Sequence, residues 1–446
     1  MRLLLSISAL SALSSLTVPA LAQDTSHNKQ ACEGSEPAYS PSQQLEACTA
    51  LINTGIAAPF DLAIAFNDRG NAYTAQKEFA RAITDFDQAI RLKPDFAKAF
   101  YNRGTAYHKL NQFTRAIADY DQAIQLKPDY ADAFNNRGAA YDELQQYALA
   151  ISDDDQAIQL KPDFAEAFLN RGNAHTDQKE YVRAIADYDQ AIRLKPDYVE
   201  AFFNRATAYK EQKQYIRTIA DYDQAIKLKP DFARAFYNRG NAYTDQKEFA
   251  RAIADFDQAI RLRPDYAEAF INRGNAHLDQ QQYVLAITDY EKAIQLNPDI
   301  ALAFFNRGTA YYNQKQYVRA IADYDQAIRL KPDYAEAFYN RGNCHHDQKQ
   351  YAQAIADYDQ AIQLKPDLAE AFLNRGSDYH EQKQYAQAIA DYDQAIRLKP
   401  NYAEAFNNRG LAYYKQKQYP LAFTDYNQAI RLLSVVRTFG AKWGAD

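Results

Sequence analysis

The chain has 446 residues, of which 51 are Lys or Arg and 57 are Asp or Glu, so its formal net charge is −6. This acidic balance argues against a nucleic-acid partner, because nucleic acids favour a basic stripe on the protein. After the N-terminal segment no apolar run approaches the ~20 residues of a membrane span, and we expect no membrane insertion.

The first 22 residues have the pattern of a secretory signal peptide. Residues 1–2 are a short basic start, residues 3–18 are mostly apolar, and residues 20–22 read Ala-Leu-Ala, a small-x-small cleavage motif. We therefore expect cleavage after Ala22 and an exported bacterial protein, either periplasmic or secreted.

Residues 23–62 form a distinct N-terminal segment that contains Cys32 and Cys48. In an oxidising compartment a disulfide between these two cysteines is the natural interpretation. Metal binding is the weaker alternative, since no cluster of His or carboxylate residues accompanies the pair. The stretch QQLEACTALINTG, residues 43–55, favours the second helix of a degenerate half-repeat. We predict a cap that the disulfide pins to the rest of the chain.

Residues 63–436 repeat one 34-residue pattern eleven times without an insertion, and residues 437–446 remain as a C-terminal tail. Positions within a repeat are numbered here from 1, starting at Ala63 and at every 34th residue after it. Position 4 is always Phe, at Phe66, Phe100, Phe134, Phe168, Phe202, Phe236, Phe270, Phe304, Phe338, Phe372 and Phe406. Such periodicity is typical of one elongated array.

Each repeat is predicted to contain two amphipathic helices. In the repeat that begins at Ala233, apolar residues recur at spacings of three and four, before and after a break at residues 245–247. Pro264 ends the second helix, because proline lacks an N–H and disfavours helix in the residue before it. Asp265, with Glu268 three residues later, predicts a capping box for the next helix.

At these positions the chain resembles the tetratricopeptide repeat (TPR) family. The family pattern is matched in the sixth repeat by Phe236, Gly240, Tyr243, Ala252, Phe256, Ala259 and Pro264, and similarly in all eleven repeats. The resemblance implies an all-α, right-handed superhelical solenoid of helix-turn-helix repeats whose first helices line a concave surface. Position 7 departs from the family, with Arg where the pattern has Leu. Local departures include Asp154 for the Phe or Tyr of position 24, and Asp378 for the small Ala of position 10.

No motif in the chain points to catalysis. Glycine occurs almost only at position 8, so there is no phosphate-binding loop, and the carboxylates recur as copies and not as one unique pair. A Cys-His-His-Asp stretch, Cys344 to Asp347, falls on positions 10 to 13 of its repeat, and consecutive helical residues diverge by about 100°. We interpret it as an accident of the pattern. We expect no catalytic residues, no metal site and no cofactor.

Arg at position 7 and Asp at position 23 occur together in all eleven repeats, for example Arg103 and Asp119. A buried charge must be paired. We therefore interpret this recurrence as a half-buried ion pair that ties the two helices together, in preference to a charged binding surface.

Position 6 carries a row of asparagines, called here the Asn ladder. Asn is a poor mid-helix residue, so its repetition on the face opposite the predicted core points to binding, although plain copying of the repeat would also produce it. An amide both donates and accepts, so it can hold a peptide backbone through two hydrogen bonds. Asp68 replaces Asn in the first repeat, and the ladder is Asn102, Asn136, Asn170, Asn204, Asn238, Asn272, Asn306, Asn340, Asn374 and Asn408.

Position 13 is mostly acidic, and its only basic residues are Lys109 and Lys415. We therefore predict a non-catalytic protein-interaction scaffold that binds an extended polypeptide, basic or neutral in charge, in the concave groove. The alternative is a structural or polysaccharide-handling component of a cell-envelope assembly. The acidic residues of position 13 are Glu143, Asp177, Glu211, Asp245, Asp279, Asp347 and Glu381.

Overall fold

The computed structural model describes residues 27–34, 39–54 and 58–440, with side chains up to residue 433. All regular secondary structure in these ranges is helical, as predicted. The predicted signal peptide and residues 441–446 lie outside the described residues. The chain divides into two compact units, Met1–Leu228 (unit 1) and Lys229–Asp446 (unit 2), and each is described by itself.

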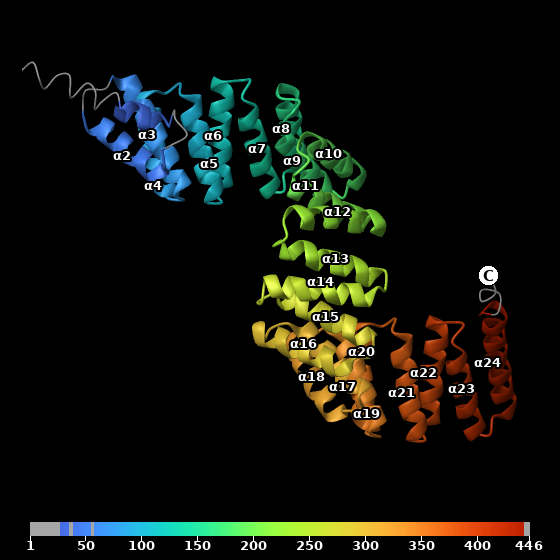
Figure 1. Ribbon diagram of the computed structural model, residues 1–446. Coiled ribbons are helices and arrows are strands. Elements are labelled where there is room, and N and C mark those ends of the chain that lie inside the picture. The colour runs from blue at the N-terminus through green and yellow to red at the C-terminus, as the bar shows by residue number, and fades with distance from the viewer. Residues whose placement is uncertain (1–26, 35–38, 55–57, 441–446) are drawn as a thin grey trace, which may run out of the picture. The chain divides into compact units, whose positions relative to one another are not determined.

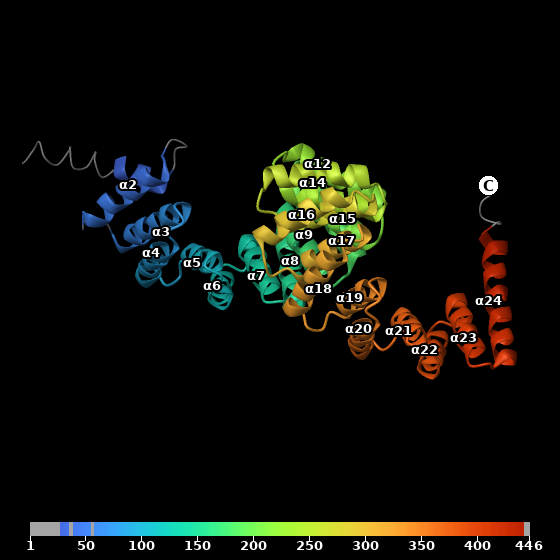
Figure 2. The ribbon, with the colours of Figure 1, turned by 90° about the horizontal axis from the view of Figure 1, so that it is seen from below.

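Unit 1 contains the N-terminal cap and the first five repeats. Successive helices pack side by side, as α5, α6 and α7 do in Figure 1 and again from below in Figure 2. The cap has a short helix over residues 27–33 followed by α2. The helices are α2 Pro41–Asn53, α3 Pro59–Ala75, α4 Phe79–Leu92, α5 Ala97–Lys109, α6 Phe113–Leu126, α7 Ala131–Glu143, α8 Tyr147–Leu160, α9 Ala165–Asp177, α10 Tyr181–Leu194, α11 Val199–Glu211 and α12 Tyr215–Leu228.

Unit 2 contains the remaining six repeats in the same alternation of first and second helices (Figure 1). Its helices are α13 Ala233–Asp245, α14 Phe249–Leu262, α15 Ala267–Asp279, α16 Tyr283–Leu296, α17 Ala301–Asn313, α18 Tyr317–Leu330, α19 Ala335–Asp347, α20 Tyr351–Leu364, α21 Ala369–Glu381, α22 Tyr385–Leu398, α23 Ala403–Lys415 and α24 Tyr419–Gly440. Among the described helices of both units, none has the length and apolar character needed to cross a bilayer.

The first helix of every repeat ends at a residue with left-handed backbone conformation. Position 15 has φ between 58° and 63° in all eleven repeats although it is never glycine. In the sixth repeat this residue is Lys247, and the Glu248 N–H after it donates to the Tyr243 carbonyl at 2.8 Å. The predicted break at residues 245–247 is confirmed, and it is made by a conformation that L residues adopt at a cost of roughly 1–2 kcal/mol.

The capping box predicted at Asp265 and Glu268 is wrong. The N-cap of α15 is Tyr266, and no side chain caps this helix. Asp265 lies one residue earlier, inside a tight turn in which the Tyr266 N–H donates to the Arg263 carbonyl at 3.2 Å. The Asp265 carboxylate accepts instead from Arg263 Nε at 3.3 Å. The tight proline turn therefore moves the aspartate out of capping position.

The core of nine repeats is an aromatic ring of the second helix that packs on the glycine of the first; the third repeat has Asp154 in place of the ring, and the fifth has Ala206 in place of the glycine. In the sixth repeat a Cβ on Gly240 would lie 2.7 Å from the Phe256 ring. Ala235 and Ala242, at positions 3 and 10, are also fully buried, whereas Phe236 is only half-buried. The buried residues of the first helix therefore do not form a single stripe, because this helix packs on two sides.

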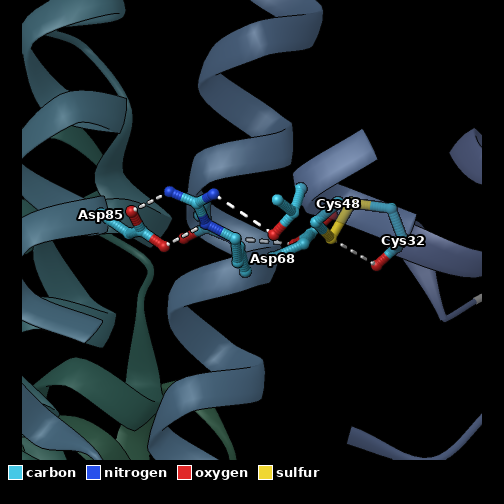
Figure 3. The surroundings of a disulfide bond; sticks show 7 residues. Cys32, Cys48, Asp68 and Asp85 are labelled. Atoms are coloured by element: carbon cyan, nitrogen blue, oxygen red, sulfur yellow. Dashed lines mark hydrogen bonds and ion pairs between the residues drawn. A yellow bond between two sulfur atoms is a disulfide. The ribbon is translucent and has the colours of Figure 1, made fainter. Parts of the chain in front are cut away.

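The N-terminal cap packs on the first repeat. Cys32 and Cys48 form a disulfide, and both cluster with Leu51 of α2 and Ala65 of α3 in the core. Figure 3 shows the disulfide together with Asp68 and Asp85 of the first repeat. The helix α3 begins at Pro59, four residues before the predicted start of the array at residue 63, and α24 continues beyond residue 436.

Candidate functional site: the first-helix face

The first-helix face comprises positions 2, 5, 6, 9, 12 and 13 of the first helices. All ten residues of the Asn ladder are half-buried on it, so their side chains lie at the boundary between the packed core and solvent. Each is one 34-residue period from the next in sequence. We describe the ladder within each unit, where neighbouring repeats pack directly.

Most of the ladder amides donate a hydrogen bond to the preceding repeat. Asn204 Nδ2 donates to Asn173 Oδ1 at 2.8 Å, and Asn136 Nδ2 donates to the Tyr101 hydroxyl at 3.0 Å. The acceptor is always at position 5 or 9 of the preceding repeat. These seven donors are Asn102, Asn136, Asn170, Asn204, Asn272, Asn306 and Asn374.

Two of these amides use both of their N–H donors in this way. Asn272 Nδ2 donates to the Tyr237 hydroxyl at 3.0 Å and to Asn241 Oδ1 at 2.8 Å. Asn374 repeats the arrangement one hundred and two residues later in the sequence. The capacity that remains on each amide is that of Oδ1 as an acceptor. The sequence suggested that each amide pairs with a peptide group through two hydrogen bonds. At these two positions the amide can accept a hydrogen bond from a ligand but has no N–H left to donate.

The hydrogen bonds between the ladder amides and positions 5 and 9 of the preceding repeat are called here the seam. In the first repeat the seam ends at Asp68, which replaces the ladder asparagine. Asn67 Nδ2 donates to Asp68 Oδ1 at 3.0 Å, and Asn67 Oδ1 in turn accepts from Asn102 at 2.9 Å. Burial raises the pKa of Asp68, and the hydrogen bond from Asn67 opposes this rise. The seam partners at positions 5 and 9 were missed in the sequence, because nothing in one repeat shows which residue of its neighbour faces position 6.

The Arg–Asp pairs are structural, as predicted. Arg137 donates from Nε and Nη2 to the two carboxylate oxygens of Asp153 at 2.7 and 2.6 Å, and Asp153 is only 5% exposed. The same two-bond pairing joins positions 7 and 23 in all eleven repeats, namely in Arg69, Arg103, Arg137, Arg171, Arg205, Arg239, Arg273, Arg307, Arg341, Arg375 and Arg409. Burial raises the pKa of Asp153, and Arg137 counteracts that rise.

The same arginines also bridge consecutive repeats. Arg137 Nη1 donates to Asp121 Oδ1 of the preceding second helix at 2.6 Å. The same third bond is made by Arg103, Arg137, Arg171, Arg205, Arg273, Arg341, Arg375 and Arg409. A planar guanidinium offers several donors in a fixed fork, which suits it to hold three oxygens on two repeats.

Position 13 lies at the solvent-exposed margin of the first-helix face. All nine of its charged residues are exposed, and seven of them are acidic. Charge on this margin therefore acts on a ligand mainly through screened, salt-dependent attraction.

Position 12 differs between the two units. In four consecutive repeats of unit 2 it carries a ring that meets the ring of position 17 at a tilted or edge-on angle, with centroids 5.2 to 6.0 Å apart. The pairs are Tyr312 with Tyr317, His346 with Tyr351, His380 with Tyr385, and Tyr414 with Tyr419. In unit 1 position 12 is Thr, His, Asp, Thr and Lys in chain order, and the histidine, His108, forms the same kind of pair with Phe113 at 5.2 Å.

The Cys-His-His-Asp stretch does not converge on one point. Cys344 is fully buried, and burial raises the pKa of its thiol to about 12. His345 Nδ1 lies 2.7 Å from Gln350 Oε1, and His346 Nδ1 lies 2.5 Å from Asp378 Oδ1 of the next repeat. Across the residues that the structure describes, no three His, Cys, Asp or Glu side chains are arranged to hold a metal ion.

Solved structures with similar helical arrays include TPR proteins of several kinds. YrrB, described as a TPR protein with an unusual peptide-binding site, is 25% identical over 41% of this chain and 95% of its own, with a TM-score of 0.37. Yeast Tom70 is 16% identical over 85% and 96%, with a TM-score of 0.41. The Cut9 and Hcn1 assembly of the APC/C is 15% identical over 88% and 90%, with a TM-score of 0.44. No curated protein sequence matches the chain.

Family models match most of the array. A model described as TPR repeat matches residues 70–111, 105–145, 172–213, 207–246, 240–281, 274–315 and 376–417, which is more than half of the chain. Further tetratricopeptide repeat models match residues 131–164, 305–369 and 403–434. With helix pairs at the predicted 34-residue spacing and these matches along the array, the chain belongs to the tetratricopeptide repeat family and is an all-α repeat solenoid.

Proposed function

We propose that this protein-interaction scaffold binds an extended polypeptide segment along the first-helix face. The observation that carries the proposal is the Asn ladder, which places one half-buried amide in each of ten repeats. An extended chain presents backbone N–H groups at regular intervals, and each ladder oxygen is an acceptor for one of them. Recognition of this kind holds the backbone without selecting a side chain.

The hydrogen bonds of the ladder support a specific polarity for this contact. Asn272 and Asn374 use both of their N–H groups within the array, so they offer oxygen and no donor. At these positions a ligand must then supply donors, which include its backbone N–H groups and the side chains of Lys and Arg. The acidic residues of position 13 favour the same choice, and we expect a basic or neutral segment whose binding weakens with added salt.

The aromatic pairs of unit 2 support a second candidate function. Exposed rings are a common platform for sugars. Tyr414 and Tyr419 are 53% and 54% exposed, whereas the other six rings of these pairs are half-buried. A polysaccharide-handling component of a cell-envelope assembly would use these rings. Calorimetric titration with a panel of cell-envelope oligosaccharides separates the two, because replacement of Tyr414 and Tyr419 by Ala would abolish glycan binding and leave peptide binding unchanged.

We also propose that the protein is exported, to a bacterial periplasm or beyond. The signal-like residues 1–22 and the disulfide between Cys32 and Cys48 support this location, because disulfides persist in oxidising compartments. Intact mass of the protein from the envelope fraction, alkylated without reductant, should correspond to cleavage after Ala22. One alkylated thiol at most is expected, and three would contradict the disulfide.

The polypeptide proposal is tested by removing the central ladder amides. The variant replaces Asn204, Asn238, Asn272, Asn306 and Asn340 by Ala. Its retention of a fluorescent pool of short random-sequence peptides is compared with that of the native protein at two salt concentrations. A matched control replaces the glutamines of position 26 on second helices, namely Gln190, Gln224, Gln258, Gln326 and Gln360.

We expect the ladder variant to lose peptide retention and the glutamine variant to keep it. Helicity should be preserved or slightly raised, because Ala is a better helix former than Asn. The lost inter-repeat hydrogen bonds should lower stability, so binding is measured well below the unfolding midpoint of each variant. Equal retention by the ladder variant and the native protein would overturn the proposal.

A further inference from the structure

The third repeat, residues 131–164, places a carboxylate where every other repeat places an aromatic ring. Position 24 is Phe or Tyr in the ten other repeats and Asp154 in this one. Asp154 is 0% exposed and lies against Gly138, as the rings do in other repeats. In the described part of the chain neither of its carboxylate oxygens has a hydrogen-bond partner. A buried polar group in this state is costly, by about 1–3 kcal/mol or more for a charged group.

The cations of this region already have partners. Arg137 holds the adjacent Asp153, and Arg171 holds Asp187 and Asp155. Burial raises the pKa of Asp154 well above its ordinary value, the charge of Asp153 adds to this rise, and Arg171 only partly opposes it. Asp154 is therefore a carboxylate without a cation of its own.

In repeats that have a tyrosine at position 24, its hydroxyl can extend to the first-helix face. In the fourth repeat the Tyr188 hydroxyl donates to Asn173 Oδ1 and lies 2.9 Å from Thr176 Oγ1, at positions 9 and 12. In the third repeat these two positions are Ala139 and Asp142. The Asp154 side chain lacks the ring that fills this space in the fourth repeat, so it lies buried beneath the surface to which we assign the polypeptide.

The surface above Asp154 is acidic. Asp142 is half-buried and its Oδ1 has no hydrogen-bond partner in the described chain. Burial and the charges of Asp177 and Glu143 raise the pKa of Asp142 to about 6. Since no trio of ligating side chains in the described residues is arranged for a metal ion, an organic cation fits this acidic place better.

We propose that the third repeat is a recognition site for one Lys or Arg side chain of the bound polypeptide. The aliphatic stem of that residue occupies the place of the missing ring, and its charged head pairs with Asp154 beneath Asp142. A cation and a carboxylate removed together from water form strong, directional hydrogen bonds. The site rests on the proposed function, because it requires a polypeptide on the first-helix face, and it fixes the register of that polypeptide.

The first test uses two pools of short random-sequence peptides, one with a fixed central Arg and one with the neutral isostere citrulline. We expect the native protein to bind the Arg pool about tenfold more tightly, as expected for a charged hydrogen bond. In Asp154→Tyr and in Asp154→Asn the Arg preference should fall to the small, salt-dependent part that the acidic residues of position 13 supply. The tyrosine variant should fold well, because the ring is standard at this position. An unchanged Arg preference in both variants would overturn the site.

The second test does not depend on peptide binding. Pentylammonium should raise the unfolding midpoint of the native protein more than the neutral control pentanol does, and Asp154→Tyr should abolish the difference. If neither peptide pool binds but pentylammonium stabilises, the proposed function fails and the cation site stands. If peptides bind and pentylammonium has no effect beyond pentanol, the cation site fails and the proposed function stands.

Discussion

The third and tenth repeats each place an aspartate in a core position that is apolar elsewhere, and the array treats the two differently. Asp378, in the tenth repeat, replaces the alanine of position 10 and is fully buried. One of its oxygens lies 2.5 Å from His346 Nδ1 of the preceding repeat. Asp154 is equally buried and has no such partner in the described chain.

The difference shows that a buried aspartate in a repeat array can be paired only by a side chain of its own repeat or of a neighbouring repeat. The ninth repeat has a histidine at position 12, one repeat before Asp378, and the ring also packs edge-on against Tyr351. The third repeat has a further acid, Asp142, at its own position 12. In a solenoid each repeat contacts only its neighbours, so no distant residue can relieve the charge. The four predictions below test this contrast, from the largest expected effect to the smallest.

Removal of the position 7 arginine should destabilise both repeats, and the third repeat more than the tenth. Arg137→Ala leaves Asp153 unpaired beside Asp154, whereas Arg375→Ala leaves only Asp391 unpaired in the tenth repeat. We expect each to lower the free energy of unfolding by about 3–5 kcal/mol, with Arg137→Ala at the upper end. Urea denaturation with hydrogen exchange of the affected repeat measures the loss. The exposed Arg115→Ala is the control, and equal curves for all three variants would contradict the expectation.

Restoration of the standard core residue should help the third repeat and not the tenth. Asp154→Tyr removes an unpartnered carboxylate and buries a ring, which should raise the free energy of unfolding by about 2–3 kcal/mol. Asp378→Ala removes one paired oxygen together with one that has no hydrogen-bond partner in the described residues, so its net effect should stay within about 1 kcal/mol. Thermal unfolding of both variants decides, and a larger gain from Asp378→Ala would reverse the comparison.

The tenth repeat should show a pH dependence that comes from its ion pair. The hydrogen bond with Asp378 raises the pKa of His346, and the charges of Asp378, Asp347 and Glu381 raise it further against burial. A raised folded-state pKa stabilises fully below the unfolded value of about 6.5, and the stabilisation is lost as pH rises through the folded value.

The pH dependence is measured as unfolding midpoints from pH 5 to pH 9 for the native protein and Asp378→Ala. The native midpoint should fall more steeply as the pH rises above the ordinary histidine range. His380, at the same position one repeat later, packs against the Tyr385 ring and provides a matched control through His380→Ala, whose profile should be as steep as that of the native protein. Parallel profiles for native protein and Asp378→Ala would show that the pair does not stabilise the repeat.

The smallest effect should be the same in both repeats. Gln145 and Lys383, at position 15, have φ of 59° and 61°. Glycine would relieve roughly 1–2 kcal/mol of left-handed strain and add unfolded-state entropy, so Gln145→Gly and Lys383→Gly should each stabilise by at most about 1 kcal/mol. Thermal unfolding should give equal shifts, and unequal shifts would mean that the two repeats differ in backbone as well as in core.

The sequence was sufficient for features that one repeat determines alone. Spacings of three and four predicted both helices, and the constant pairing of Arg239 with Asp255 predicted the ion pair. It failed where a turn overrides a local preference, since Asp265 has the right residue type for a cap but lies one residue too early. A strained Lys247 could not be foreseen either, because position 15 contains no glycine.

The candidate site needed the neighbouring repeat to be understood. The recurrence of Asn272 drew attention to the first-helix face, but its N–H groups donate to Tyr237 and Asn241 of the repeat before it. Asp154 was visible as a departure from the pattern, whereas its lack of a partner depends on the positions of Arg137 and Arg171. The residue types therefore identified the unusual positions, whereas the packing of neighbouring repeats determined which hydrogen-bond partners each of these residues has.

The arginine bridges make the coupling between consecutive repeats unequal in the two chain directions. Arg137 holds the buried Asp153 of its own repeat and the 48%-exposed Asp121 of the preceding one. If the repeat of Arg137 unfolds, Asp121 is already largely hydrated and loses little. If the preceding repeat unfolds, the half-buried guanidinium of a folded repeat loses one of its acceptors. Within each unit, local unfolding should therefore spread more readily toward the C-terminus than toward the N-terminus. The disulfide-bonded cap stabilises the N-terminal end, from which such unfolding would spread.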